Sequence, residues 1–194
     1  MPSNTNQSSS DLQLFFIALL PSVKAQEYAN QIKHHFADVY ASKGALKSPP
    51  HVTLQPPFKW DINHVSDLEN VLADFVLQCS AIPLVLENFA AFKPRVIYMD
   101  VHKTPELLAI QKDLNAHLES TLNIVDKMSQ RRAFTPHLTV GFRDLSKTNF
   151  YRAWDEFKDK KVYFQCDVSQ LTLLKHNGKK WDIYREFNLL NKSI

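Results

Sequence analysis

Pro50-His51-Val52-Thr53-Leu54 and Pro136-His137-Leu138-Thr139-Val140 are two copies of one pattern: a proline, a histidine, an aliphatic residue, a threonine and a second aliphatic residue. Successive side chains of a β-strand point to opposite faces, so the histidine and the threonine of each copy share a face. In a chain of this composition, one match is expected by chance on the order of 0.003 times. The repeat therefore predicts two strands that together build a site of two histidines and two threonines.

The order of elements around the two copies also repeats. Hydrophobic periodicity predicts a strand, a helix, the motif strand, a second helix and a further strand around each copy. For the first copy these elements fall near 12–20, 22–40, 50–54, 62–79 and 84–92, with Ser22 as a helix cap. For the second copy they fall near 96–101, 104–118, 136–140, 146–157 and 162–166, with Thr104 as a cap and Pro105 in the first turn.

An internal duplication explains this repeated order, since the two motif histidines stand 86 residues apart. Beyond the repeat, Asn177-Gly178 separates two apolar runs, which is typical of a β-hairpin turn. We therefore expect an added hairpin that completes one of the sheets.

Composition is that of an ordinary globular protein, with 194 residues, 44% hydrophobic residues and a formal net charge of +3. We predict a disordered tail at 1–10 and a single domain over 11–194. The apolar run 14–20 is too short to span a membrane. Cys79 and Cys166 lack the spacing of a zinc site or a disulfide framework, so we predict free thiols, no metal and a cytoplasmic location.

The residue types of the motif favour phosphodiester chemistry. At neutral pH one imidazole can accept a proton from a nucleophile while a second, protonated imidazole donates one to a leaving oxygen. Each threonine hydroxyl can donate a hydrogen bond to a phosphate oxygen where negative charge gathers. A single strand histidine is more often a packed or surface residue, but the duplication favours catalysis by both.

The quoted motifs, extended to Pro-His-Val-Thr-Leu-Gln-Pro-Pro-Phe and Phe-Thr-Pro-His-Leu-Thr-Val, resemble the paired His-x-Thr-x motifs of the 2H phosphoesterase superfamily. The similarity is greatest to its bacterial 2′-5′ RNA ligase-like branch, also described as RNA 2′,3′-cyclic phosphodiesterases. This resemblance implies a bilobal α+β fold in which two antiparallel sheets related by pseudo-twofold symmetry line a central cleft, with helices outside.

The resemblance also implies the reaction and its residues. It implies metal-independent opening of a 2′,3′-cyclic phosphate, or related 2′-5′ phosphodiester chemistry, at an RNA end or on a small nucleotide. We also expect a monomer that needs no cofactor. By position, His51 and His137 are the catalytic pair, and Thr53 and Thr139 hold the phosphate. We assign His51 as the acid and His137 as the base, and the pseudo-symmetry leaves the reverse assignment open.

Three matters stay open at the level of sequence. Many relatives carry an arginine soon after the second motif, whereas here Phe142 takes that place and Arg143 follows, on the opposite face if the strand continues. Arg131 and Arg132 are alternatives for the phosphate. Aromatic residues such as Phe58, Trp60 and Tyr98 are candidates to stack a nucleobase, although core packing is the simpler interpretation, and none is assigned to the site.

The alternative functions are 2′-5′ RNA ligation, which reverses the same displacement, and a nucleotide-binding or RNA-binding module without turnover. A scaffold whose basic surface docks a partner is a third possibility, and it would leave the histidines dispensable.

Overall fold

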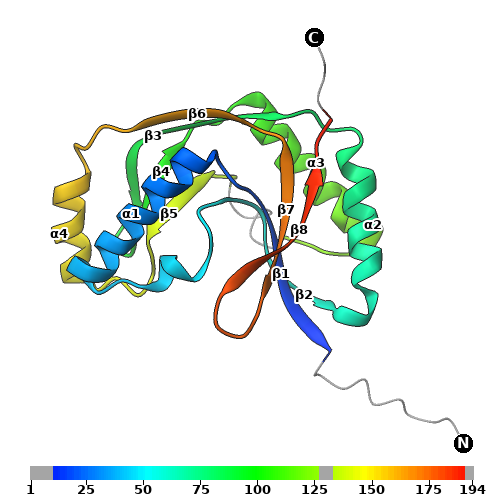
Figure 1. Ribbon diagram of the computed structural model, residues 1–194, viewed down its shortest axis with the longest axis horizontal. Coiled ribbons are helices and arrows are strands. Elements are labelled where there is room, and N and C mark those ends of the chain that lie inside the picture. The colour runs from blue at the N-terminus through cyan, green and yellow to red at the C-terminus, as the bar shows by residue number, and fades with distance from the viewer. Residues whose placement is uncertain (1–10, 127–132, 191–194) are drawn as a thin grey trace, which may run out of the picture.

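The structure is a computed structural model that describes residues 11–126 and 133–190. These residues form two four-stranded antiparallel sheets with four α-helices packed on them (Figure 1), which confirms the predicted α+β class. The first sheet has the strand order β2-β1-β7-β8 and the second β5-β4-β3-β6. The predicted tail at 1–10 lies outside the described residues.

The strands of the first sheet are β1 (Leu12–Leu19), β2 (Val52–Asp61), β7 (Gln170–His176) and β8 (Trp181–Asn188). Those of the second are β3 (Ile82–Phe92), β4 (Val96–Val101), β5 (His137–Gly141) and β6 (Tyr163–Val168). The helices are α1 (Val23–Tyr40), α2 (Val65–Val76), α3 (Pro105–Leu122) and α4 (Lys147–Phe157), and two 3-10 turns are η1 (Gly44–Lys47) and η2 (Ile62–His64).

The two motif strands occupy equivalent places. β2 is an edge strand of the first sheet and β5 an edge strand of the second, and these two edges contact each other. Each motif strand pairs with the central strand that opens its half of the chain, β1 for β2 and β4 for β5. The fold thus brings the two motifs to one line of contact between the sheets.

The predicted duplication holds for the order of elements but not for every strand position. Strand, helix, motif strand, helix and strand occur twice, as β1-α1-β2-α2-β3 and β4-α3-β5-α4-β6. Both fifth strands, β3 and β6, join the second sheet and pair with each other. The corresponding places in the first sheet belong to the β7–β8 hairpin, which confirms that the predicted hairpin completes one sheet.

α1 and α3 each pack against the sheet of the other half of the chain. α1 follows β1 of the first sheet but packs against β5 of the second (Figure 1). α3 follows β4 of the second sheet and packs against β2 of the first. The approach of α1 is close, because a Cβ atom on Gly141 of β5 would lie 2.5 Å from the Phe36 ring of α1. Apolar side chains from both sheets and all four helices consequently share one hydrophobic core.

Two helix caps were predicted, and of these Thr104 forms its capping hydrogen bond and Ser22 does not. The Thr104 side chain accepts a hydrogen bond from the Leu107 N–H, with Pro105 as first helical residue, and Ser146 caps α4 in the same way. Ser22 occupies the N-cap position of α1, as predicted, but its side chain makes no capping hydrogen bond within the described chain. The Ser22 N–H instead lies 3.4 Å from Sγ of Cys166.

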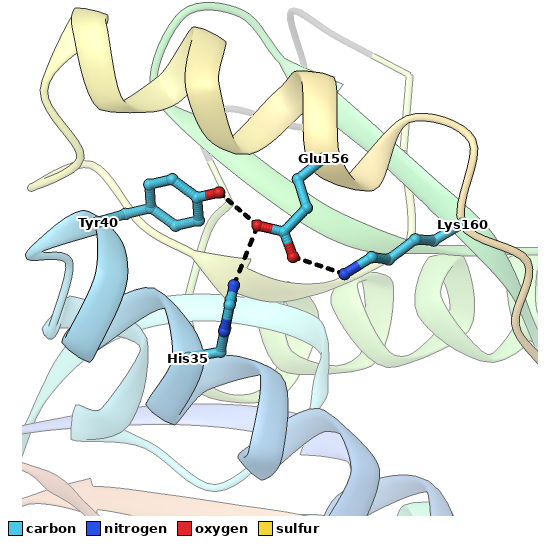
Figure 2. A network of polar contacts seen from close by, with 4 residues as sticks. All are labelled: His35, Tyr40, Glu156 and Lys160. Atoms are coloured by element: carbon cyan, nitrogen blue, oxygen red, sulfur yellow. Dashed lines mark hydrogen bonds and ion pairs between the residues drawn. The ribbon is translucent and has the colours of Figure 1, made fainter.

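Glu156 of α4 ties that helix to α1 (Figure 2). Its carboxylate accepts hydrogen bonds from the Tyr40 hydroxyl, from Nε2 of His35 at 3.1 Å and from Nζ of Lys160 at 2.6 Å. Burial alone would raise the pKa of Glu156, but these donors outweigh it and lower that pKa to about 2. The ionised carboxylate therefore stabilises the contact between the two helices.

Two further predictions concern the state of the cysteines and the absence of a membrane span. Cys79 and Cys166 are both free thiols, as predicted. Across 11–126 and 133–190, no helix is both long enough and apolar enough to cross a membrane.

Candidate active site

The first motif enters the edge strand β2 from a turn. His51 directly precedes the strand, and its Nδ1 atom lies 2.7 Å from the carbonyl oxygen of Pro49. A carbonyl oxygen only accepts, so Nδ1 carries the hydrogen and Nε2 of the neutral ring keeps its lone pair. The Phe16 ring of β1 packs on the imidazole at a centroid distance of 4.8 Å. One hydrogen bond and one aromatic contact therefore fix the orientation of this ring.

The second motif repeats this arrangement in the other sheet. Nδ1 of His137 lies 2.7 Å from the carbonyl oxygen of Thr135, which again leaves Nε2 with the lone pair. The Tyr98 ring of the central strand β4 packs on this imidazole at 5.2 Å, as Phe16 does on the first. The pseudo-symmetry of the fold thus extends to the tautomer and the support of each histidine.

His51, Thr53, His137 and Thr139 line one cavity of about 580 Å³. The alternation expected from the sequence explains this, since both histidines and both threonines are half-buried while the residues between them, Val52 and Leu138, are fully buried. Other lining residues are mostly apolar: Phe16, Leu54, Pro56, Pro57, Phe134 and Trp181. A nucleotide is of the size that such a cavity accommodates.

His51 is held in its neutral form. Burial lowers its pKa to about 4, although its hydrogen bond to the Pro49 carbonyl acts in the opposite direction. The positive charge of Lys33 on α1 lowers the His51 pKa further. Lys33 is itself fully buried, donates a hydrogen bond of 3.0 Å to the Ser48 carbonyl, and has its pKa lowered to about 7 by burial.

His137 differs from His51 in having a carboxylate neighbour. Burial holds the pKa of His137 below its usual value, and the hydrogen bond to Thr135 and the negative charge of Asp100 offset part of that shift. Asp100 stands opposite His137 in the antiparallel pair of β4 and β5. The two imidazoles therefore have the same geometry but different electrostatic surroundings.

Lys47 and Arg143 give one wall of the cavity a positive character, beside an acidic lining residue, Asp126. The prediction for Arg143 depended on the strand continuing. Strand β5 ends at Gly141, and the chain then turns, so both Phe142 and Arg143 line the cavity. Arg131 and Arg132, the alternatives, lie outside the described residues.

Asp144 holds this wall together across the two halves of the molecule. Its carboxylate accepts hydrogen bonds of 2.8 Å from the Ser42 hydroxyl and from the N–H groups of Lys43 and Gly44. Gly44 also packs closely against Phe142, since a Cβ atom there would lie 2.8 Å from that ring. The segment that carries Lys47 is thereby fixed beside the exit of the second motif strand.

The aromatic candidates take other places. Phe58 and Trp60 line a separate, smaller cavity with residues 122–125, and Tyr98 supports His137. The aromatic residues that line the main cavity include Phe16 and Trp181, which the sequence reasoning did not identify. No motif marks them, and only the pairing of β1 with β7 and of β7 with β8 brings them to the site.

Within the two described ranges, no three His, Cys, Asp or Glu side chains gather where they could hold a metal ion.

The sequence matches the 2′-5′ RNA ligase superfamily over residues 21–180. It is 29% identical over 175 residues to a protein of Geobacillus sp. strain WCH70, and the alignment covers 88% of this chain and 93% of that protein. A protein of Bacillus pumilus strain SAFR-032 is 30% identical over 178 residues, covering 89% and 95% of the two chains. Both carry the provisional name of phosphoesterase.

Solved structures share the fold. The Thermus thermophilus protein TT0787 superposes with a TM-score of 0.66 at 16% identity, over 93% of this chain and 99% of that one. Escherichia coli LigT in complex with 3′-AMP gives a TM-score of 0.64 at 17% identity, with the same coverage. Family match, curated relatives and architecture agree, so the chain belongs to the 2′-5′ RNA ligase superfamily and is a phosphoesterase of the 2H type.

Proposed function

We propose that this phosphoesterase opens 2′,3′-cyclic phosphates, at RNA ends or on small nucleotides, by acid/base catalysis with His51 and His137 and without a metal ion. The observation that carries the proposal is the shared cavity. Two imidazoles with the same tautomer and two threonine hydroxyls line it from opposite halves of the fold. These are the groups that a metal-free phosphoryl displacement needs on either side of the phosphorus atom.

The reaction is a hydrolysis in which one imidazole acts as base and the other as acid. The neutral imidazole takes a proton from water through Nε2 as the water oxygen forms a bond to phosphorus. The bond between phosphorus and one ribose oxygen breaks, and the protonated imidazole donates its Nε2 proton to that oxygen. The products are a phosphomonoester and a free hydroxyl, and proton exchange with solvent resets both rings.

Thr53 and Thr139 are proposed to donate hydrogen bonds to the non-bridging phosphate oxygens, where charge gathers in the transition state. Each threonine lies two residues from its histidine on the same strand face, so each half of the molecule supplies one proton-transfer group and one donor. Arg143 and Lys47 add positive charge on the same cavity wall.

The charge environment supports His51 as the base and His137 as the acid, which reverses the assignment made from the sequence. A base must be neutral before reaction, and burial with the nearby Lys33 charge keeps the pKa of His51 at about 4. An acid must be protonated, and although burial lowers the pKa of His137 too, the negative charge of Asp100 opposes that shift, whereas the charge of Lys33 adds to the shift of His51. The pseudo-symmetry of the fold left the assignment of acid and base open. We base our proposal on the Asp100 carboxylate, which stands beside His137 and, in the described part of the chain, has no counterpart among the charges that act on His51.

The nucleotide character of the substrate has separate support. LigT of Escherichia coli has been crystallised with 3′-AMP, with ATP and with NADP+. The family description favours a second candidate activity, 2′-5′ RNA ligation, in which a ribose hydroxyl replaces water as the attacking group and the same two proton transfers take place.

The test is an assay in EDTA with 2′,3′-cyclic nucleotides, RNA ending in a cyclic phosphate and ADP-ribose cyclic phosphate, followed by identification of the phosphate position in each product. His51→Ala and His137→Ala should each lose activity, and Thr53→Val and Thr139→Val should each lose roughly 100- to 1000-fold in kcat. His34→Ala, at an exposed position of α1, is the matched control. An active single histidine variant contradicts the mechanism, and tight binding without turnover supports a binding module instead.

A further inference from the structure

One wall of the cavity is built from apolar rings rather than charges. Phe16 of β1, Pro56 and Pro57 of β2, and Trp181 of β8 all line it. The positive lining residues Lys47 and Arg143 come from η1 and from the turn after β5. The two walls thus differ in chemistry, although the histidines that they flank are arranged alike.

Two ring contacts connect Trp181 to His51, the proposed general base. The Phe16 ring lies 4.8 Å from the His51 imidazole, and the Trp181 ring lies edge-on to Phe16 at 4.7 Å. A planar group that stacks on this indole therefore lies a short distance from a phosphate bound at His51. In a nucleotide, the ribose spans a similarly short distance between the nucleobase and the phosphate.

The indole is also held rigidly. Trp181 pairs with His176 across the β7–β8 hairpin, and the two rings contact edge-on at 4.9 Å. Nδ1 of His176 accepts a hydrogen bond of 3.2 Å from the Gly178 N–H. The Asn177 side chain accepts from two further N–H groups of the turn, both at 2.9 Å. A side chain fixed in this way loses little entropy when a ligand stacks on it.

Trp181 does not belong to the main core. Phe16, Ala18 and Leu174 form a separate small apolar cluster, and Trp181 packs on its border while remaining partly exposed. An indole that stays partly exposed where it lines a cavity is available to a ligand, whereas one in the main core is not.

We propose that Trp181 is the nucleobase-binding residue of this enzyme, on which the base of a nucleoside 2′,3′-cyclic phosphate stacks while the phosphate lies between His51 and His137. The inference rests on the proposed function and extends it, because it assigns the substrate class: a cyclic phosphate that carries an aromatic base, in preference to a cyclic phosphate of a sugar alone. Stacking accepts any base, so little base selectivity is expected.

The experiment compares adenosine 2′,3′-cyclic phosphate with methyl β-D-ribofuranoside 2,3-cyclic phosphate, which has the same reacting group and no base. Trp181→Ala should lower kcat/KM for the adenosine substrate roughly 5- to 150-fold, the range that corresponds to base stacking on an aromatic side chain. The same variant should leave the base-free substrate within about 2-fold of wild type, since nothing stacks there. Trp181→Phe, which keeps a ring, should retain most activity on both.

Trp60→Ala is the matched control, because Trp60 lines the other cavity and should affect neither substrate. An equal loss on both substrates in Trp181→Ala, or no loss on either, overturns the inference. Equal kcat/KM of the wild-type enzyme on the two substrates overturns it as well. In each of these cases turnover itself is seen, so the proposed function stands.

If the wild-type protein turns over neither compound, the proposed function fails, and titration calorimetry with 3′-AMP and ribose 3-phosphate tests the base site separately. A dissociation constant for 3′-AMP that rises 5- to 150-fold in Trp181→Ala supports the site. An unchanged constant, or 3′-AMP binding no tighter than ribose 3-phosphate, overturns it.

Discussion

Replacing Gly141 by alanine tests whether α1 packs on the second motif strand. The φ angle of Gly141 is not positive, so alanine fits the local backbone without strain. The added Cβ would lie 2.5 Å and 2.8 Å from two ring carbons of Phe36. That ring is fully buried and packs against Phe157 at 5.1 Å and Tyr40 at 5.5 Å, so it has little room to move.

Overpacking of this kind costs about 1–3 kcal/mol. For a chain of this size the melting temperature should fall by roughly 2–12 °C. Urea denaturation gives the free energy of unfolding, and calorimetry gives the melting temperature. Activity should fall too, because Gly141 ends the strand that carries His137 and Thr139.

A double-mutant cycle with Phe36→Leu identifies the clash as the cause. The smaller side chain relieves the contact, so the double variant should be more stable than the sum of the two single changes predicts, by about 1 kcal/mol or more. Gly178→Ala is the control, since its positive φ of 94° strains alanine while no atom lies within 4 Å of the added carbon. Phe36→Leu should not rescue it. A Gly141→Ala variant as stable as wild type, or additive effects in the cycle, refutes the described packing of α1 on β5.

Three further predictions concern charge. Asp100→Asn should lower the pKa of His137 and so move the alkaline limb of the kcat/KM profile to lower pH. At pH 7 the rate should fall about tenfold for each pH unit by which that limb moves. A shift of the acidic limb instead would make His137 the base. Asp144→Asn should raise KM roughly 3- to 10-fold with little change in kcat, because the cavity wall that carries Lys47 loosens. The control is Asp155→Asn, at an exposed position, which should leave KM unchanged. A fall in kcat alone contradicts this prediction. Glu156→Gln should lower the free energy of unfolding at pH 7 by about 1–2 kcal/mol after allowance for solvent screening. Because the pKa of Glu156 falls from 4.5 to about 2 on folding, the difference in unfolding free energy between the variant and the wild type should be full above pH 4.5 and vanish as pH falls towards 2. Urea denaturation at several pH values measures this difference. A constant difference across that range refutes the ionised carboxylate as its source.

Much of the local structure could be read from the sequence. Apolar residues at helical or alternate spacing record which face of an element is buried, so the strands, the helices and the two predicted cap positions fall where the pattern places them. Ser22 holds the cap position without the capping hydrogen bond, because a residue type that favours a cap does not fix the partner of its own side chain. The four motif residues could be predicted as one group because the pattern occurs twice.

The two His-x-Thr strands, the repeated order of elements around them and the hairpin that follows could all be predicted from the order of residues along the chain. The folded arrangement was needed to show which sheet edges meet, that α1 packs on β5 and α3 on β2, and that β3 and β6 share a sheet. It was also needed to show that Trp181 and Arg143 line the cavity. The physical reason is that periodicity records burial along one segment, whereas the partner of that segment depends on how faces distant in the sequence fit together.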